Sequence, residues 1–310
     1  MPSPVSPPIV APIVAVVGAT ASGKTSLSLD LAQALGGEIV NTDAMQVYRG
    51  MDIGTAKLPP ADRRGIAHHL LDTHDVSEPL TVAAFQEEAR TVIAALRADG
   101  VTPVLVGGSA LYTRAILDRF EFPGEDAAIR ARLEQEAEGV GSAAMHDRLA
   151  ERDPEAATRI RPDNTRRIVR ALEVIELTGR PFTASLPALE YADPATVQVG
   201  VRIAREELEQ RIRHRVDAMF EAGLVEEVRG LGPLGRTAAT AIGYREVAAY
   251  LAGDLSEDEA RERTVIATRR FARRQEKWWR KDPRITWVDT DARDRVERAL
   301  AAVSAVRTGD

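Results

Sequence analysis

The eight residues GATASGKT, from Gly18 to Thr25, restrict the possible folds of this chain more than any other feature. They match the G-x-x-x-x-G-K-[ST] pattern of a loop that holds phosphate groups. An apolar, β-branched stretch over residues 13–17 precedes the loop, and apolar residues at helical spacing follow it until Gly36. This order predicts a buried strand of a parallel sheet, then a phosphate loop at the N-terminus of a helix.

The residues of the loop suit a diphosphate or a triphosphate. Backbone N–H groups converge on phosphate oxygens, and the helix N-terminus adds partial positive charge. Lys24 is expected to neutralise a terminal phosphate, and the Thr25 hydroxyl to ligate Mg²⁺. A nucleotide-hydrolysing protein would also need a strand that ends in a Mg²⁺-organising aspartate, but the strand expected over 103–108 ends in glycine and serine. The predicted diphosphate-binding residues are Gly18, Ala19, Thr20, Ala21, Ser22, Gly23, Lys24 and Thr25.

Strands and helices are expected to alternate, which is typical of an α/β fold. Further strands are predicted over 38–42, 103–108, 197–204 and 285–289, and a helix over 81–98. Between 122 and 193 only charged helical patterns occur, so this range is predicted to be an all-helical insertion domain. The P-loop α/β core would then be discontinuous, over 13–121 and 194–310, after a disordered tail over 1–12.

Composition excludes several classes of protein. The 310 residues include no cysteine, which rules out disulfides, thiol catalysis and cysteine-ligated zinc. No apolar stretch approaches the roughly 20 residues of a membrane span. The Pro/Ser-rich start lacks the features of a secretion signal, so a cytoplasmic protein without a membrane partner is expected. The net charge of −6 by itself argues against a nucleic-acid partner.

A set of longer motifs carries a resemblance to a known family. In order along the chain they are GATASGKT, DAMQVYRGMDIGTAK, HHLLD, VGGSALY, RPDNTRRIVRALEVIELTG, RIRHRVDAMFEAGLVEEV, TAIGYREVAAYL and TRRFARRQEKWWR. With these motifs the chain resembles the tRNA dimethylallyltransferases, also called tRNA isopentenyltransferases, of the bacterial type. The resemblance spans about Val14 to Arg280. The run DAMQVYRGMDIGTAK is long and specific, whereas the phosphate loop alone would admit many kinases and ATPases.

The resemblance implies a fold, a reaction and its partners. Members of this family resemble P-loop kinases in fold. They move a dimethylallyl group from dimethylallyl diphosphate to N6 of the adenosine on the 3′ side of the anticodon and release diphosphate. The loop is then expected to hold the diphosphate of the prenyl donor, with Mg²⁺ as the cofactor and no ATP consumed. The partners implied are a tRNA anticodon stem-loop and dimethylallyl diphosphate, and a monomer is expected.

The reaction needs a base and a group that stabilises diphosphate. An exocyclic adenine amine is a weak nucleophile, so a carboxylate that takes its proton would help the attack. Asp43, after the second strand, is the candidate base, with a Mg²⁺-organising or helix-capping aspartate as the alternative. Arg215 matches the arginine that the family is thought to place on the diphosphate, and Arg211 and Arg213 are weaker candidates. Together with Thr25, Asp43 and Arg215 are the predicted catalytic residues.

The target base must leave its stack to be reached, so a flipped nucleotide is expected. Gln46 could recognise an adenine edge by paired hydrogen bonds, and a structural amide is the alternative. The resemblance implies tRNA contacts at Asp43, Ala44, Met45, Gln46, Ser109, Arg130, Arg166, Arg167, Ile168, Val169, Arg170, Thr240, Ala241, Ile242, Gly243, Tyr244 and Arg245.

Two basic clusters offset the acidic total. From 261 to 284 the chain has ten Lys and Arg against three Asp and Glu, and a second run lies over 159–167. Such surfaces on separate units suggest a clamp around a stem-loop. Trp278 and Trp279 are expected to anchor their helix in the core. His68, His69 and His74 lack a zinc-site spacing and are expected to pack or cap.

Three rival functions remain open at this point. A small-molecule kinase would share the loop and the strand order. A prenyltransferase for free adenine nucleotides would share the chemistry, but a mononucleotide does not require two basic clusters. An RNA-binding module with a vestigial loop would not need Lys24, Thr25 and Asp43 together.

Overall fold

The fold is that of a computed structural model of the chain, which describes residues 11–120, 122–182 and 189–308. The described residues form two compact units, one within residues 1–118 and 191–310 and the other within residues 119–190. The helical insertion predicted over 122–193 overlaps the second unit. Most of the tail predicted over 1–12 lies outside the described residues, and at its end the Ala11 carbonyl accepts a hydrogen bond of 2.8 Å from Arg97 Nε.

The larger unit contains a sheet of six strands in the order β3-β2-β4-β1-β5-β6, and every neighbouring pair is parallel. The α/β class predicted from the sequence is confirmed. The strand β3 was not predicted, because two residues are too few to show a period. The strands are β1 (Ile13–Gly18), β2 (Gly37–Asn41), β3 (His68–His69), β4 (Thr102–Val106), β5 (Thr196–Arg202) and β6 (Ile285–Asp289).

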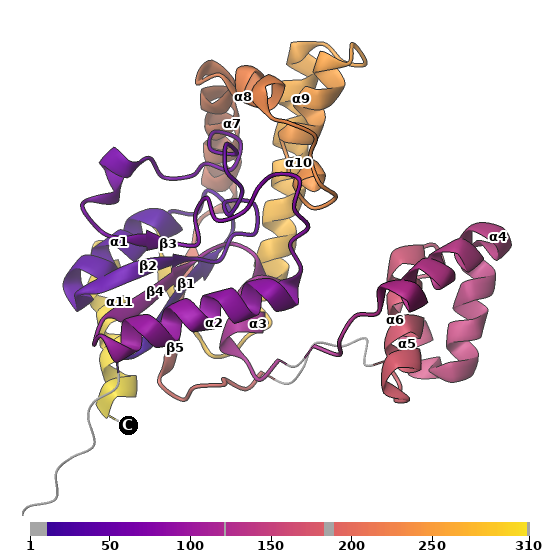
Figure 1. Ribbon diagram of the computed structural model, residues 1–310. Coiled ribbons are helices and arrows are strands. Elements are labelled where there is room, and N and C mark those ends of the chain that lie inside the picture. Colours follow the sequence, from indigo (N-terminus) through magenta and orange to yellow (C-terminus); the bar gives the residue numbers. More distant parts are fainter. Residues whose placement is uncertain (1–10, 121, 183–188, 309–310) are drawn as a thin grey trace, which may run out of the picture. The chain divides into compact units, whose positions relative to one another are not determined.

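Helices cover both faces of this sheet, as Figure 1 shows. Successive strand residues point to opposite faces, so Val14 and Val16 belong to one apolar cluster and Ala15 and Val17 to the other. Helices α1 (Lys24–Leu35) and α11 (Arg295–Thr308) contribute to the first cluster. Helices α2 (Val82–Ala98), α3 (Ala110–Leu117) and α10 (Glu257–Trp279) contribute to the second. Two-sided burial explains why β1 is apolar throughout.

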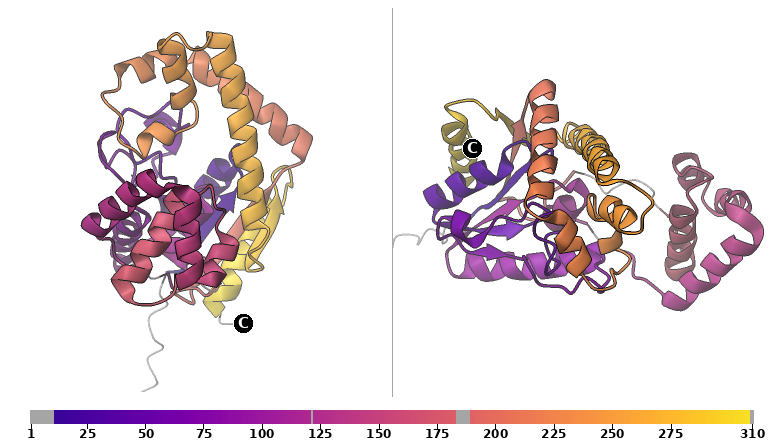
Figure 2. Two further views of the ribbon diagram at one scale, coloured as in Figure 1. Left: turned by 90° about the vertical axis from the view of Figure 1, so that its right-hand side faces the viewer. Right: turned by 90° about the horizontal axis from the view of Figure 1, so that it is seen from above.

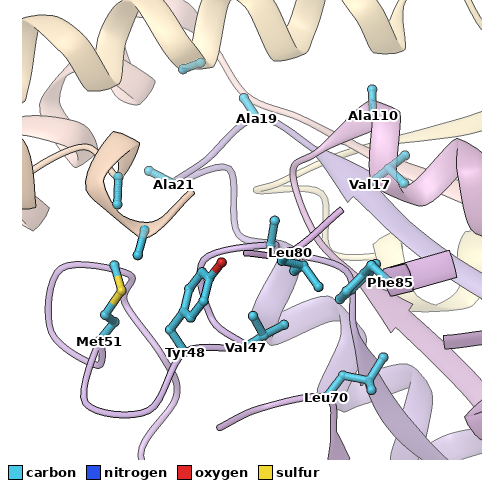
Figure 3. Packing of buried hydrophobic residues seen from close by; sticks show 14 of the residues in the cluster. Val17, Ala19, Ala21, Val47, Tyr48, Met51, Leu70, Leu80, Phe85 and Ala110 are labelled. Atoms are coloured by element: carbon cyan, nitrogen blue, oxygen red, sulfur yellow. The ribbon is translucent and has the colours of Figure 1, made fainter. Parts of the chain in front are cut away.

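The second apolar cluster reaches the phosphate loop. Ala19 and Ala21 of the loop belong to it, together with Tyr48 and Met51 of the segment that follows β2. Figure 3 shows these side chains with Val17, Leu80 and Phe85. The loop and the long motif after β2 are therefore supported by one shared core, although they are separate in sequence.

Four helices near the C-terminus complete the larger unit. The long helix α10 packs against α7 (Arg205–Glu221) and α9 (Tyr244–Leu251), and α8 (Leu224–Gly230) packs against both α7 and α9. The left view of Figure 2 shows α10 along its length. The start of α10 has a capping box, in which Ser256 Oγ accepts from the Glu259 amide and the Glu259 carboxylate accepts from the Ser256 amide.

The smaller unit has its own core. It consists of α4 (Ala127–Arg152), which is interrupted at Gly141 with a φ of 85°, then α5 (Pro154–Arg159) and α6 (Thr165–Thr178). Leu133, Leu149 and Leu172 are fully buried between these helices. In the part of this unit that the structure describes, all regular elements are helices.

Candidate functional site

A cavity of about 380 Å³ lies at the carboxyl ends of β1, β2 and β4. In open parallel sheets, ligands bind at this edge because the loops after the strands meet there. The wall combines the phosphate loop, the turns after β2 and β4, and two helices from far along the chain. Its polar residues include Thr20, Lys24, Thr25, Asn41, Asp43, Gln46, Thr55, His68, Arg211, His214, Arg215 and Gln275.

The phosphate loop has the backbone that its sequence requires. Gly18 and Gly23 have φ values of 143° and 98°, and a Cβ at Gly18 would lie 2.9 Å from the Val201 carbonyl oxygen. Of the predicted diphosphate-binding residues, Thr20, Ala21, Gly23, Lys24 and Thr25 line the cavity. Ala19 and Ser22 are buried behind it. The loop therefore presents one side to the cavity and packs the other into the protein.

The loop is also held by Gln275, which the sequence analysis did not single out. Gln275 is a buried residue of α10, and its Oε1 accepts a hydrogen bond of 2.8 Å from the Thr20 amide. A Cβ at Gly108 would lie 2.2 Å from Gln275 Nε2, so the glycine after β4 leaves room for this side chain. The signal available in the sequence was an uncharged glutamine within the basic run over residues 269–281.

Lys24, Asp43 and Arg215 border the same cavity and influence one another electrostatically. Burial, with the nearby Arg215 charge, lowers the pKa of Lys24 to about 7 against the opposing effect of Asp43. Burial also raises the pKa of Asp43, although the Met45 amide and the two cations oppose this. A dianionic ligand would stabilise the protonated form of Lys24. The site is therefore suited to an anion.

Asp43 is positioned by a short turn after β2. Its Oδ1 accepts a hydrogen bond of 3.0 Å from the Met45 amide, and its own amide donates to Asn41 Oδ1 at 2.8 Å. Asn41 is buried and also donates to the carbonyls of Asp43 and Leu70. Among the described residues, Asp43 Oδ2 has no hydrogen-bond partner, and this oxygen suits the role of a base. Asn41, which sequence reasoning missed, positions the carboxylate.

The three arginines of α7 differ in where they lie. Arg211 and Arg215, one helical turn apart, both line the cavity, and Arg215 Nη1 donates to Thr20 Oγ1 at 3.2 Å. Burial lowers the pKa of Arg215, and Asp43 opposes this. Arg213 is exposed and pairs with Glu262 of α10 at 3.1 Å. Arg215 and Arg211 therefore lie where a ligand in the cavity could contact them, and Arg213 is not among the residues that line it.

Gln46 borders the cavity, but the nitrogen of its side-chain amide already makes a hydrogen bond within the protein. Its Nε2 donates a hydrogen bond of 3.0 Å to the Thr55 carbonyl. Recognition of an adenine edge by paired hydrogen bonds, which the sequence suggested, would need this same Nε2. Nearby, Ala44 is buried and Met45 packs on the apolar cluster. Ser109 precedes α3 and is partly exposed.

The predicted tRNA-contacting residues of the smaller unit have mixed surroundings. Arg130 is bound by the buried Glu173, at 2.7 Å from Nη2, and Arg170 also contacts Glu173, at 3.0 Å. Ile168 and Val169 are core residues, because they lie on the face of α6 that packs on α4. Their side chains are therefore not at the surface where an RNA would bind. Arg166 and Arg167 are exposed.

The run from Thr240 to Arg245 likewise contains both exposed and buried residues. Thr240 and Arg245 are exposed, Ile242 is partly exposed, and Ala241 and Gly243 are buried. Tyr244 is fully buried and donates a hydrogen bond to Glu227 Oε1 at 2.5 Å. A residue in this position packs inside the protein and does not stack on a base.

The tryptophans of α10 and three histidines lie in different surroundings. Trp279 is buried as expected, but Trp278 is 45% exposed and does not anchor the core. His69 contacts Glu38 at 2.6 Å, and His74 contacts Glu88 at 3.3 Å. His68 hydrogen-bonds the Ile66 carbonyl and lines the cavity, a position that sequence reasoning did not anticipate. Among the residues that the structure describes, no helix is long and apolar enough to cross a membrane.

Comparison with known proteins agrees with this geometry. A family model described as IPP transferase matches residues 46–282. A tRNA dimethylallyltransferase of Nocardioides sp. is 69% identical over 303 residues, which cover 96% of this chain and 97% of that protein. The tRNA dimethylallyltransferase of Streptomyces coelicolor is 57% identical over 298 residues, covering 95% of each chain.

Solved structures are similar over nearly the whole chain. The tRNA isopentenylpyrophosphate transferase of Bacillus halodurans is 38% identical, with a TM-score of 0.70 and coverage of 96% of this chain and 97% of that one. A eukaryotic dimethylallyltransferase acting on tRNA is 26% identical, with a TM-score of 0.81 and coverage of 96% and 80%. The P-loop-like sheet is thus shared with these enzymes.

Proposed function

The chain belongs to the IPP transferase family, and from this premise we propose that it is a tRNA dimethylallyltransferase. It transfers a dimethylallyl group from dimethylallyl diphosphate to N6 of the adenosine on the 3′ side of the anticodon and releases diphosphate. The observation that carries the proposal is the convergence of Lys24, Asp43 and Arg215 on one cavity beside the phosphate loop. Two cations serve the leaving group, and the carboxylate serves the nucleophile.

The diphosphate is proposed to bind at the phosphate loop. The amides at the start of α1 and the side chains of Lys24 and Arg215 offer donors and positive charge to its oxygens. These groups stabilise the diphosphate most when the C–O bond to the allyl group breaks, because the oxygen then gains a full negative charge. This timing favours the transition state over the bound substrate.

Asp43 is proposed to take the proton from the adenine N6 amine as the new C–N bond forms. Its raised pKa makes the carboxylate a stronger base than an exposed aspartate. The hydrogen bond from the Met45 amide keeps Oδ1 in place, so that Oδ2 can point toward the amine. The same turn carries Gln46, whose side chain also borders the cavity.

Magnesium fits the residues at this site. Among the described residues, no cluster of three or more His, Asp and Glu could hold a metal without the substrate. Mg²⁺ is commonly bound by one or two protein oxygens together with phosphate oxygens and water. The exposed Thr25 hydroxyl, at the start of α1 and on the cavity wall, would be the protein ligand. When bound, the ion would neutralise charge on the leaving diphosphate.

We also propose an oligomeric state, a cellular compartment and a set of RNA contacts. We propose a monomer as the active unit. A tRNA substrate supports a place in the cytoplasm. Exposed arginines of α10 and of residues 166–167 are the proposed contacts with the stem-loop backbone.

One experiment tests the reaction. The protein is incubated with dimethylallyl diphosphate, Mg²⁺ and a tRNA anticodon stem-loop, and the nucleosides are then analysed by mass spectrometry. One adenosine is expected to gain a single C₅H₈ unit. Preference for AMP over the stem-loop as acceptor would identify a nucleotide prenyltransferase, and phosphate transfer from ATP without prenylation would identify a kinase.

A further inference from the structure

Glu227 makes an unusual set of contacts with the turn over residues 52–54, which leads into the wall of the cavity. This residue of α8 accepts hydrogen bonds from three successive backbone amides, those of Asp52 (3.0 Å), Ile53 (2.7 Å) and Gly54 (3.1 Å). Tyr244 donates a fourth, at 2.5 Å. Three consecutive N–H groups around one carboxylate form an anion-binding nest. Here the anion is a side chain of the protein itself.

Tyr244 and Gly54 fit together around this carboxylate. A Cβ at Gly54 would lie 2.4 Å from Cε2 of the Tyr244 ring, so only glycine allows the ring to pack on the turn. Burial and the hydrogen bond to Glu227 raise the pKa of Tyr244, so its hydroxyl remains a donor. The motifs DIGTAK and TAIGYREV are therefore joined through Glu227.

The turn continues directly into the cavity wall. Thr55 and Ala56, which follow the three amides, line the cavity. The Thr55 carbonyl accepts the hydrogen bond from Gln46 Nε2 at 3.0 Å. A carbonyl oxygen can only accept, so this contact decides which end of the Gln46 amide faces the turn. Gln46 Oε1 is then left as an acceptor that the cavity can use.

An acceptor at this place suits the target base. The backbone N–H of Gln46 donates to the Asp43 carbonyl at 3.2 Å. The proposed base, Asp43, and the acceptor, Gln46 Oε1, therefore belong to one turn. The exocyclic amine of adenine has two N–H groups, of which one must be given up to the base and the other can donate to an acceptor.

We propose that Glu227 is a positioning residue, which holds the turn over residues 52–54 so that Thr55 orients Gln46 and Gln46 Oε1 receives an N–H of the target adenine. The inference rests on the proposed function, because it assigns a partner to the adenine amine. It adds a residue that touches neither substrate.

The test compares Glu227→Ala with Glu226→Ala. Glu226 is the adjacent, exposed residue of the same helix, and it pairs with Arg229. For Glu227→Ala, kcat/KM for a stem-loop RNA is expected to fall about tenfold, because the acceptor is displaced from its productive geometry. The KM for dimethylallyl diphosphate should stay within about twofold of wild type, because Glu227 holds the turn over residues 52–54 and not the phosphate loop.

Two further variants distinguish the positioning role of Glu227 from a general effect on folding. Glu227→Gln keeps one carbonyl acceptor and should restore part of the RNA kcat/KM, and Tyr244→Phe removes only one donor and should cost about twofold to threefold. Both are conservative and are expected to fold. A loss of folded protein alone would reduce kcat for all substrates equally and leave both KM values unchanged.

A double-mutant cycle with Gln46→Ala decides whether Glu227 acts through Gln46. In the Gln46→Ala background, Glu227→Ala is expected to have less than a third of its effect on RNA kcat/KM, because the group that it positions is gone. Effects that multiply, or a Glu227→Ala variant with the kinetics of Glu226→Ala, overturn the inference while the proposed function stands. A wild-type protein that prenylates no RNA overturns the proposed function and the inference together.

Discussion

The amide of Thr20 donates a hydrogen bond of 2.8 Å to Oε1 of Gln275, a residue 255 positions further along the chain. Through this contact the long helix α10 supports the phosphate loop. Arg215 Nη1 contacts the hydroxyl of the same threonine at 3.2 Å. Thr20 is thus held from two helices, α7 and α10, before any ligand binds.

Removal of this support should weaken binding of the prenyl donor. We expect Gln275→Ala to raise the KM for dimethylallyl diphosphate about tenfold, because the Thr20 amide loses its acceptor and the loop loses its preferred shape. The KM for RNA should change little. Gln33→Ala, at an exposed glutamine of α1, is the control and should match wild type. Equal donor KM values for the two variants, measured by steady-state kinetics, would contradict this role.

Asp43→Asn should remove the base without disturbing the turn, since the asparagine oxygen can still accept from the Met45 amide. We expect kcat to fall about 10²-fold to 10⁴-fold while RNA binding is retained. Because the pKa of Asp43 is raised, wild-type kcat should decline on acidification at a pH above the ordinary value of 3.8. Turnover measured from pH 5 to 9 tests this, and unchanged turnover in the variant would exclude the role.

The same shift has a consequence for stability. A carboxyl whose pKa is raised on folding binds its proton more tightly in the folded state, so its contribution to stability decreases as pH rises. Asp43→Asn cannot ionise and should therefore have a higher free energy of unfolding than wild type at pH 8. The difference should narrow as the pH falls. Urea denaturation of both proteins at pH 8 and pH 5 measures it.

Lys24 should take up a proton when the donor binds. Its pKa is lowered from 10.5 to about 7 in the folded protein, so at pH 8 the amine is mostly neutral, and a bound diphosphate favours the ammonium form. The unfolded chain binds this proton more tightly, so the contribution of Lys24 to stability rises with pH between about 7 and 10.5. Calorimetry in two buffers of different ionisation enthalpy should detect the uptake, and Lys24→Arg should lack it. Identical uptake by both proteins would contradict the assignment.

The arginines of α7 offer a matched pair. Arg215→Gln should lower kcat about 10²-fold to 10³-fold, because a cation that stabilises the leaving diphosphate is lost. Arg213→Gln, two residues away, removes a cation that is exposed and paired with Glu262, and it should leave kcat within about twofold of wild type. Single-turnover rates with saturating substrates distinguish the two. Similar losses in both variants would favour a general charge effect over a specific contact.

Glu173 should control the stability of the smaller unit. It is fully buried and binds Arg130 and Arg170. Burial alone would raise its pKa, but hydrogen bonds from the two arginines lower it instead, so its contribution to stability is lost as pH falls. Removal of one partner from a buried ion pair costs about 3–5 kcal/mol, so Glu173→Ala should destabilise the unit by a comparable amount.

The three tryptophans all lie outside residues 119–190, so tryptophan fluorescence reports on the larger unit, whereas circular dichroism reports on the helices of both units. Loss of helical circular dichroism in urea is expected to begin before the tryptophan fluorescence changes in Glu173→Ala. Glu138→Ala, at an exposed glutamate of α4, should behave as wild type. A single coincident transition in Glu173→Ala with unchanged midpoint would show that this carboxylate is dispensable.

The sequence by itself determined the elements whose signals are local. The strand β1, the phosphate loop and α1 follow from an apolar run, two glycines and a helical period within Ile13–Leu35, and no distant residue is needed to recognise them. The family motifs likewise identified Lys24, Asp43 and Arg215, which the tertiary structure brings to one cavity. The kinship with tRNA dimethylallyltransferases, read from those motifs, was confirmed.

Only the tertiary structure decided which members of a motif face the cavity and which support it. Ile168, Val169 and Tyr244 stand in runs expected to contact RNA, yet they are buried, because a helix turns successive side chains to different sides and packing selects the sides. The contacts of Gln275 with Thr20, and of Glu227 with the turn after Met51, join residues more than 170 positions apart. No local period records such contacts, since they arise only when the sheet order and the packing of α7 to α10 are set.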